Sequence, residues 1–439
     1  MLPRLMLALP LCVQLSAGAN AAPDAASSAP PPPALSAVPD HASGIYRVGE
    51  TVGWSVRRTQ DAGTTVYHYV VRENALEMLT EGELRFAGGS ARIEVPAREP
   101  AMIYVEVTEA GRVAPPLSLG AAVAPAQLLP SVPEPVDFDT FWRAGITQLE
   151  AVPVAPVLTA ADAGRPDVDY ATLFMNTIDG AHIHGQIARP HQEGRYPALL
   201  ILQWAGGPYP LQKQWVTDRA AEGWLALNVE PHDVLPDQPQ SYYDALPDEL
   251  KNYQAIGRDD RDHNYFRRMY LSDYRAVEYL ASRPDWDGHT LVVMGTSMGG
   301  QQSLCTAALN PRVTAVLVNE PSGADSNGVL HGRLSGYPNW PSNDPQALRT
   351  ALYFDTVNCA ARLRAPALVA LGFIDPIAPP AGIWTAFNRI PGRKEAVPMV
   401  DSSHNNLATA EQQRPWSERS ARWLESLRRT GVPPTLTVE

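Results

Sequence analysis

Basic residues are in the minority in this chain of 439 residues, which has 35 Lys and Arg against 47 Asp and Glu and a formal net charge of −12. An acidic surface repels a phosphate backbone, so nucleic acid is excluded as a partner. No apolar run reaches the ~20 residues that a membrane-spanning helix needs, so no membrane span is predicted. Neither a Walker-type nor a dinucleotide-binding glycine pattern occurs, and the sequence therefore predicts no nucleotide cofactor.

Cysteine is scarce too, with only Cys12, Cys305 and Cys359. Cys12 falls in residues 1–21, where one positive charge, a short apolar run and an Ala-x-Ala site indicate a secretory signal peptide cleaved after Ala21. The mature protein is then predicted to be secreted or periplasmic. In that compartment the two remaining cysteines could form a disulfide, or each could be buried as apolar filler, and the sequence leaves both readings open.

Hydrophobic residues make up 45% of the chain, which is enough for a large core. At roughly 150 residues per domain, the length suggests two or three domains. Residues 22–39 include four consecutive prolines and are predicted to be a solvated linker. Residues 40–125 contain short alternating strands separated by turn signals, a pattern that predicts a small all-β, immunoglobulin-like sandwich.

A proline-rich connector at residues 126–137 leads to a different pattern over residues 138–432. There, apolar runs of four to six residues alternate with amphipathic helical segments. Such runs are buried on both faces, as in the central strands of a parallel sheet, so we predict a doubly wound α/β domain. Its active site should lie at the carboxyl ends of the strands. The change of composition also predicts that a chain starting near residue 130 folds on its own.

The apolar run 291–294 leads directly into Gly-Thr-Ser-Met-Gly-Gly at 295–300, and a helical segment follows. Strand, tight glycine turn and helix together are typical of a nucleophile elbow, which predicts Ser297 as a nucleophile. The amide of Met298, at the start of the helix, would then point at a developing oxyanion. A glycine-rich turn without chemistry is the alternative reading.

A serine hydroxyl needs a base, and in this fold the chain order is serine, acid, histidine. Of the ten histidines, only His404 follows every plausible acid, in a loop just before a C-terminal helical segment. Asp375 follows the apolar run that precedes this loop and is our first choice for the acid. Glu320 and Asp325 follow the preceding run and are the alternatives.

A second oxyanion donor should come from the loop after an earlier strand, where the glycine-rich segment 203–207 suggests the Ala205 amide. Two other residues, His182 and His184, alternate on a predicted strand and so share one face, as metal ligands might. No Cys-rich or Asp-rich cluster accompanies them. We therefore interpret them as surface or core histidines and predict no metal.

Further short motifs are spread from residue 141 to the C-terminal helix: Phe141-Trp142, Asp179-Gly180, His184-Gly185, Arg195-Tyr196-Pro197, Tyr274-Arg275, Tyr353-Phe354-Asp355 and Pro379-Pro380. Together they resemble the acetyl xylan esterase and cephalosporin-C deacetylase family of α/β-hydrolases over roughly two-thirds of the chain. The resemblance implies Ser297, Asp375 and His404 as a catalytic triad. It also leaves a homo-oligomer open, because members of that family form rings.

The chain departs from the family pattern at several positions. The family's elbow glutamine is Met298 here, and the glutamate that usually follows the histidine is Asn405. Its oxyanion tyrosine has no match near Ala205, and the amino-terminal sandwich is an addition.

From these observations the sequence predicts a secreted serine esterase that deacetylates carbohydrate esters, namely acetylated xylan or xylo-oligosaccharides. The reaction would use a Ser-His-Asp triad, an acyl-enzyme and no cofactor. Two alternatives remain: a serine peptidase of the prolyl-oligopeptidase type, and a catalytically inert carbohydrate-binding protein.

Overall fold

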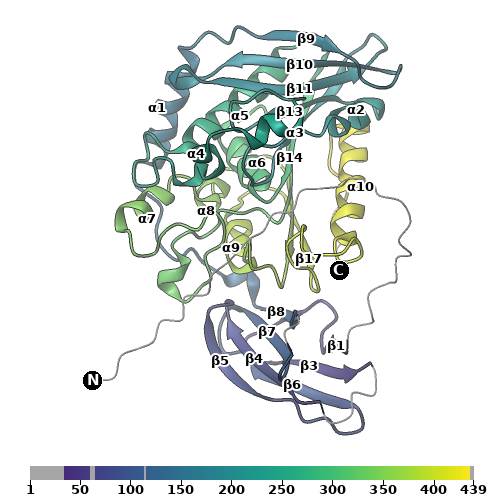
Figure 1. Cartoon of the computed structure of the whole chain (residues 1–439), viewed down its shortest axis with the longest axis vertical. Coiled ribbons are helices and arrows are strands. Elements are labelled where there is room, and N and C mark those ends of the chain that lie inside the picture. The colour runs from purple at the N-terminus through teal and green to yellow at the C-terminus, as the bar shows by residue number, and fades with distance from the viewer. Residues whose placement is uncertain (1–33, 60–64, 113–114, 436–439) are drawn as a thin grey trace.

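The computed structural model describes residues 34–59, 65–112 and 115–435. The predicted signal peptide and most of the predicted linker lie outside these ranges. Figure 1 shows a smaller all-β part below a larger part in which helices surround a sheet. Within the described residues, no helix has the length and apolar character needed to cross a membrane.

The smaller part consists of two sheets around one apolar core. The three-stranded sheet has the order β1 (Leu35–Pro39), β3 (Thr51–Arg58), β6 (Ser90–Pro96), and the five-stranded sheet has the order β2 (Ile45–Tyr46), β8 (Leu117–Val123), β7 (Ala101–Glu109), β4 (Tyr67–Glu73), β5 (Glu77–Glu83). Alternate residues of these strands, such as Val52, Trp54 and Val56, point into the core and are buried. An all-β sandwich is thus present, whereas its immunoglobulin-like topology stays a prediction.

The predicted linker is too long at its C-terminal end. Residues 35–39 do not form a solvated connector but strand β1, which pairs antiparallel with β3 from Leu35 to Pro39. Leu35 is buried in the sandwich core and anchors the segment. The strand lies at the edge of its sheet, where a proline such as Pro39 is tolerated because no partner needs its missing N–H.

The larger part is built on one nine-stranded sheet. Its strand order is β17 (Lys394–Met399), β16 (Ala367–Gly372), β15 (Ala315–Asn319), β14 (Trp286–Thr296), β12 (Tyr196–Leu202), β13 (Leu225–Glu230), β11 (His182–Pro190), β10 (Val168–Asn176), β9 (Val157–Ala161). The six strands from β17 to β13 pair in parallel, and the last three are antiparallel. The central strands are buried on both faces, as their uninterrupted apolar runs predict.

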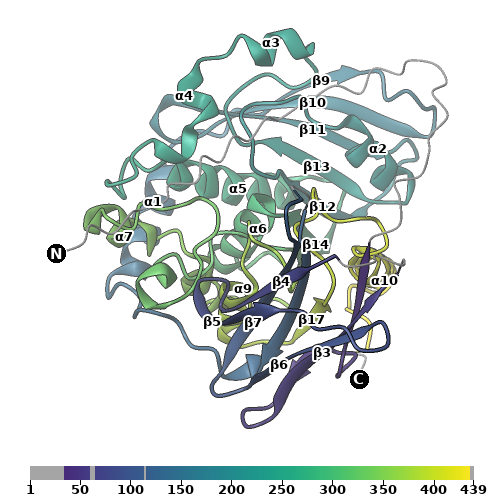
Figure 2. The ribbon, with the colours of Figure 1, turned by 60° about the horizontal axis from the view of Figure 1, so that its bottom comes forward.

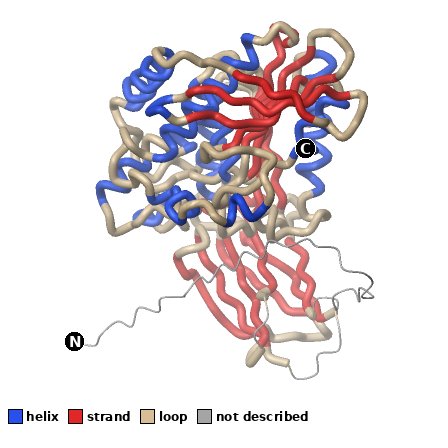
Figure 3. Tube along the Cα trace, turned by 45° about the horizontal axis from the view of Figure 1, so that its top comes forward, coloured by secondary structure: helices blue, strands red, loops and turns tan. Residues whose placement is uncertain are grey.

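Helices cover both faces of this sheet, so the predicted doubly wound α/β fold is confirmed (Figures 1 and 3). The helices are α1 (Phe138–Glu150), α2 (Lys213–Ala221), α3 (Gln240–Asp244), α4 (Asp248–Lys251), α5 (Tyr265–Ser282), α6 (Met298–Leu309), α7 (Pro345–Ala351), α8 (Thr356–Ala360), α9 (Pro380–Arg389) and α10 (Arg414–Thr430). Helices α2 and α10 share one apolar cluster with the sheet, and α5, α6, α8 and α9 share another on the opposite face.

The sandwich packs tightly against the loop that follows β16. A Cβ on Gly120 in β8 would lie only 2.6 Å from the Cβ of Phe373, so the two backbones meet where no side chain fits. Met102 of β7 and Ala122 of β8 belong to the same buried cluster as Phe373. The backbone N–H of Leu334 also donates to the Asn74 carbonyl at 3.0 Å. The two parts therefore share a continuous core.

Because the core is shared, we expect the α/β part to be less stable when the chain starts near residue 130. The composition alone predicts that this shorter chain folds independently. Exposing Phe373 and its apolar neighbours should lower Tm by roughly 5–10 °C, at about 1.5–3 kcal/mol for each large side chain exposed. Calorimetry on this truncated chain and on one lacking only residues 1–33 measures the effect. An unchanged Tm in the shorter chain would show that the two parts fold independently.

Candidate active site

The site is organised around a sharp turn between β14 and α6. Ser297 occupies this turn with φ 58° and ψ −121°, a conformation that is strained for any residue with a side chain. The turn is possible because its neighbours are glycines. A Cβ on Gly295 would lie 2.4 Å from the backbone of Gly299, and one on Gly299 would lie 2.2 Å from the Leu202 carbonyl oxygen. The close approach of these backbones places Ser297 beyond the carboxyl end of β14.

Three side chains from three separate turns form one hydrogen-bonded row. Nε2 of His404, in the loop after β17, lies 2.9 Å from Oγ of Ser297. Nδ1 of the same ring lies 2.7 Å from Oδ2 of Asp375, in the loop after β16. All three side chains are buried. The structure thus brings together the three residues that the elbow motif and the chain order single out, while their catalytic roles stay predictions.

The Asp375 carboxylate is held so that only one of its oxygens faces the histidine. Its Oδ1 accepts the backbone N–H groups of Ile377 and Ala378, each at 2.8 Å. An ionised carboxylate only accepts hydrogen bonds, so the bond to Oδ2 places a proton on Nδ1 of His404. Nε2 is then left with a free lone pair toward Ser297, which is the arrangement a general base requires.

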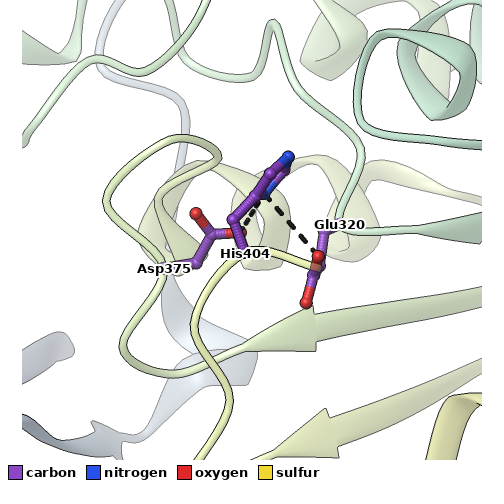
Figure 4. Close-up of side chains that lie close together, drawn as sticks. All are labelled: Glu320, Asp375 and His404. Atoms are coloured by element: carbon purple, nitrogen blue, oxygen red, sulfur yellow. Dashed lines mark hydrogen bonds and ion pairs between the residues drawn. The ribbon is translucent and has the colours of Figure 1, made fainter. Parts of the chain in front are cut away.

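Glu320 is a second buried carboxylate beside the same ring. It follows β15, and its Oε2 lies 3.6 Å from Nδ1 of His404, beyond hydrogen-bond distance. The same oxygen accepts the N–H of Asn405 at 2.6 Å, and Oε1 accepts Nε2 of Gln413 at 2.7 Å. Figure 4 shows Glu320 and Asp375 on either side of the His404 ring. Of the candidate acids, Asp375 is the one that makes the hydrogen bond.

Burial and charge act in opposite directions on these groups. Burial lowers the pKa of His404, but the hydrogen bond that its Nδ1–H donates to Asp375 and the charges of Asp375 and Glu320 outweigh it, so the net pKa is raised above 6.5. Burial, followed by the nearby charge of Asp375, raises the pKa of Glu320 to about 7. Of the two carboxylates in the site, Glu320 is therefore the one that ionises only at higher pH.

The third candidate acid, Asp325, is used elsewhere. Its carboxylate accepts two hydrogen bonds from Ser131, one from the backbone N–H at 2.9 Å and one from the side-chain hydroxyl at 2.7 Å. It also forms an ion pair of 2.8 Å with Arg333. These contacts fasten the connector to the α/β part and leave Asp325 no part in the row at His404.

The two predicted oxyanion donors lie on neighbouring segments. Met298 is the first residue of α6, so its amide has no acceptor within the helix. Ala205 lies in the loop after β12, and Nε2 of Gln302 in α6 donates to the Gln203 carbonyl of that loop at 2.9 Å. This bond fixes the loop against the elbow. Both oxyanion donors stay predictions.

Two further residues support the elbow and the loop beside it. The Tyr253 hydroxyl contacts Sδ of Met298 at 3.0 Å, and Nε2 of His232 lies 3.1 Å from the Gly206 carbonyl of the Ala205 loop. Burial lowers the pKa of His232 to about 3, so the ring is neutral. In the sequence, His232-Asp233 follows the apolar run ending at Val229 and could rim the pocket, although a simple turn is the favoured interpretation. Nothing in the sequence singles out Tyr253, which is found only from the tertiary structure.

The side chains that could bind a metal ion are already engaged in other contacts. Among the described residues, one group brings three ligand atoms within 4.8 Å of one another: Glu320, Asp375 and His404. Their oxygens and Nδ1 are already engaged in the hydrogen bonds given above, so they do not form an open ligand set. The predicted pair His182 and His184 does face one side of β11, and both rings lie near the Asp233 carboxylate, at 3.7 and 3.3 Å.

The two remaining cysteines form a disulfide. Cys305 of α6 and Cys359 of α8 are bonded, with their Cα atoms 5.0 Å apart. The sequence left this pairing open. The bond ties α6, the helix that follows Ser297, to its neighbour on the same face of the sheet.

Comparison with known proteins places the chain in one family. The acetyl xylan esterase family model matches residues 127–425. The chain is 29% identical over 377 residues to an acetyl esterase of Xylanibacter ruminicola, an alignment that covers 82% of this chain and 84% of that protein.

Two solved acetyl xylan esterases share the fold, one from a Paenibacillus species and one from a Thermoanaerobacterium species. Each is 24% identical to this chain, with TM-scores of 0.58 and 0.56. The alignments cover 69% and 64% of this chain and 98% and 92% of theirs. Both likenesses support the α/β-hydrolase architecture of the larger part.

Because the pKa of Glu320 is raised from 4.5 to about 7 in the folded protein, its ionisation favours the unfolded chain as the pH rises through this window. We expect the Tm of Glu320→Gln, relative to that of wild type, to become more positive from pH 4.5 to about 7 and to change little above. Thermal melts across this range measure the difference, with Glu193→Gln, a change at an exposed glutamate, as the control. A difference that does not vary with pH would contradict the raised pKa.

Proposed function

We propose that this protein, which belongs to the acetyl xylan esterase family, is a secreted serine esterase that removes acetyl groups from acetylated xylan or xylo-oligosaccharides. As a member of the family it is a carboxylic ester hydrolase, and the family supports action on carbohydrate esters. The observation that carries the mechanism is the row of hydrogen bonds from Ser297 through His404 to Asp375.

In the proposed reaction, Oγ of Ser297 attacks the ester carbonyl while Nε2 of His404 takes its proton. The tetrahedral intermediate collapses, the C–O bond to the sugar breaks, and His404 returns the proton to the sugar oxygen. Water then attacks the acetyl-serine ester, with His404 again acting as the base. Acetate leaves and the serine hydroxyl is restored, so atoms and protons balance without a cofactor.

Asp375 is assigned the role of holding the ring and stabilising the imidazolium. Its support is the 2.7 Å contact with Nδ1, together with the two backbone amides that fix its other oxygen. The backbone amides of Met298 and Ala205 are assigned to the oxyanion. Such donors contribute most where water is excluded, and the burial of the row at Ser297 favours that condition.

Secretion is supported by the signal-peptide pattern of residues 1–21 and by the disulfide between Cys305 and Cys359. Disulfides persist mainly in oxidising compartments, so the bond fits a periplasmic or extracellular location.

The two alternative functions have less support. A prolyl-oligopeptidase-like peptidase would share the triad, but its propeller is far larger than the sandwich of strands between residues 35 and 123. An inert binding protein has no need of a serine held in a strained turn at 2.9 Å from a buried histidine.

Ser297→Ala should lower acetate release from acetylated xylo-oligosaccharides by at least ~10³-fold, the scale expected when a triad member is removed. Ser303→Ala, in the helix that follows Ser297 and also at a buried position, should change it only a few-fold. Acetate assays and labelling by a fluorophosphonate probe measure both. Retention of more than about a tenth of the activity in Ser297→Ala would rule out the proposed nucleophile. Hydrolysis of peptide anilides but not of acetyl esters would favour the peptidase.

Asp375→Asn should lower kcat by orders of magnitude because Nδ1 of His404 loses its anionic acceptor. Glu320→Gln should cost much less and should shift the acid limb of kcat/KM to lower pH, because the Glu320 charge raises the pKa of His404. Profiles of kcat/KM against pH for both variants test this division of roles. Equal losses in the two variants would mean that the carboxylates share one function.

A further inference from the structure

A cavity of about 180 Å³ lies between the sandwich and the loop that carries Asp375. Figure 2 shows β4 and β7 of the sandwich beside α9, which begins just after this loop, and β7 and α9 are in contact. The sandwich and the acid loop each form a wall of the cavity, lined chiefly by Arg72, Asn74, Tyr104 and Glu106 on one side and Asp375 and Pro376 on the other. The family model begins at residue 127 and leaves the sandwich out, whereas the alignment to the Xylanibacter ruminicola acetyl esterase covers 82% of this chain and so includes part of it.

The sandwich wall combines an aromatic ring with planar polar groups. Nη1 of Arg72 forms an ion pair with Glu106 at 3.0 Å, and both side chains are about one-third exposed, so each keeps hydrogen-bonding capacity toward the cavity. The Tyr104 hydroxyl lies 3.2 Å from Oγ of Ser118 and 3.4 Å from Glu106. A sugar ring offers apolar C–H faces to an aromatic side chain and hydroxyls that both donate and accept.

Asn74 adds a donor at the floor of the cavity. It is 7% exposed, and its Oδ1 accepts the N–H of Met102 at 3.0 Å. Its side-chain Nδ2 makes no hydrogen bond to another described residue. The residue is also held at φ 50°, and its carbonyl accepts the N–H of Leu334. The sandwich thus holds the side-chain amide and the α/β part holds the backbone carbonyl of the same residue, with Nδ2 left as a donor for a ligand.

We propose that this cavity is a subsite that binds one neutral sugar residue of the carbohydrate chain while an acetylated neighbour reacts at Ser297. The proposal rests on the proposed function. The cavity is smaller than the ~300–1,000 Å³ typical of sites for larger ligands, which suits a single ring and not an oligosaccharide. Asp375, which contacts Nδ1 of His404, forms part of its wall, so an occupant lies at the Asp375 end of the hydrogen-bonded row.

The binding energy of a second sugar residue can stabilise the transition state only for substrates that contain such a residue. The sandwich should therefore raise kcat/KM for acetylated oligosaccharides and leave that for a small aryl ester unchanged. This difference separates a subsite from a purely structural contact, because a distortion of the acid loop would impair both substrates alike.

The test uses the full chain with Tyr104→Ala and Arg72→Ala. Each variant should lower kcat/KM for acetylated xylotriose by about tenfold or more and change that for p-nitrophenyl acetate by less than about twofold. Arg57→Ala, at an exposed position of β3, is the matched control and should affect neither. Tyr104→Phe separates the contributions of ring and hydroxyl, since only the hydroxyl is lost.

Equal losses on both substrates, or no loss on either, would overturn the subsite. A wild-type protein that releases acetate from p-nitrophenyl acetate but not from xylotriose acetates would contradict the carbohydrate substrate and the subsite together. Titration of unacetylated xylotriose into wild type and Tyr104→Ala provides a readout that does not depend on hydrolysis. Binding that is equally strong in both would place the sugar elsewhere, even if the esterase activity is found.

Discussion

The backbone contact between Gly299 and the end of β12 is the constraint on which the rest of the site depends. A Cβ on Gly299 would lie 2.2 Å from the Leu202 carbonyl oxygen. The first turn of α6 can therefore pack against this strand only if residue 299 has no side chain. That approach allows Ser297 its positive φ and sets it above the sheet. Because β14, β15, β16 and β17 are successive parallel neighbours in the sheet, the loops that follow them lie at the same edge. Glu320, Asp375 and His404, which follow these strands, therefore lie near Ser297.

The electrostatics of this edge follow from its burial. Two carboxylates and one imidazole share a space from which water is excluded, and two adjacent negative charges are unfavourable there. The hydrogen bonds differ accordingly. Asp375 contacts the ring directly, whereas Glu320 is linked to Asn405 and Gln413 and has its pKa raised to about 7. Glu320 thereby joins the end of β15 to the histidine loop and to the residue before α10, which fixes the loop's position relative to the sheet.

The sandwich and the α/β part form one structural unit at this same edge. Gly120 meets Phe373, two residues before Asp375, and the sandwich supplies one wall of the cavity beside the acid loop. On the other side of the elbow, the disulfide from Cys305 and the bond from Gln302 hold α6 to α8 and to the Ala205 loop. The three side chains of the hydrogen-bonded row lie on loops and turns, but each of these segments is fixed to a helix or strand beside it.

The sequence by itself determined the α/β architecture and the candidates Ser297, Asp375 and His404. These follow from local signals: uninterrupted apolar runs, glycines on both sides of a serine, and the chain order that parallel strands impose on the loops after them. Only the tertiary structure decided that residues 35–39 join a sheet, that Cys305 pairs with Cys359, that Glu320 lies beside His404, and that the sandwich shares a core with the acid loop. Each of these is a contact between segments far apart in the chain, and side-chain packing at such a distance leaves no periodic pattern in the residues that make it.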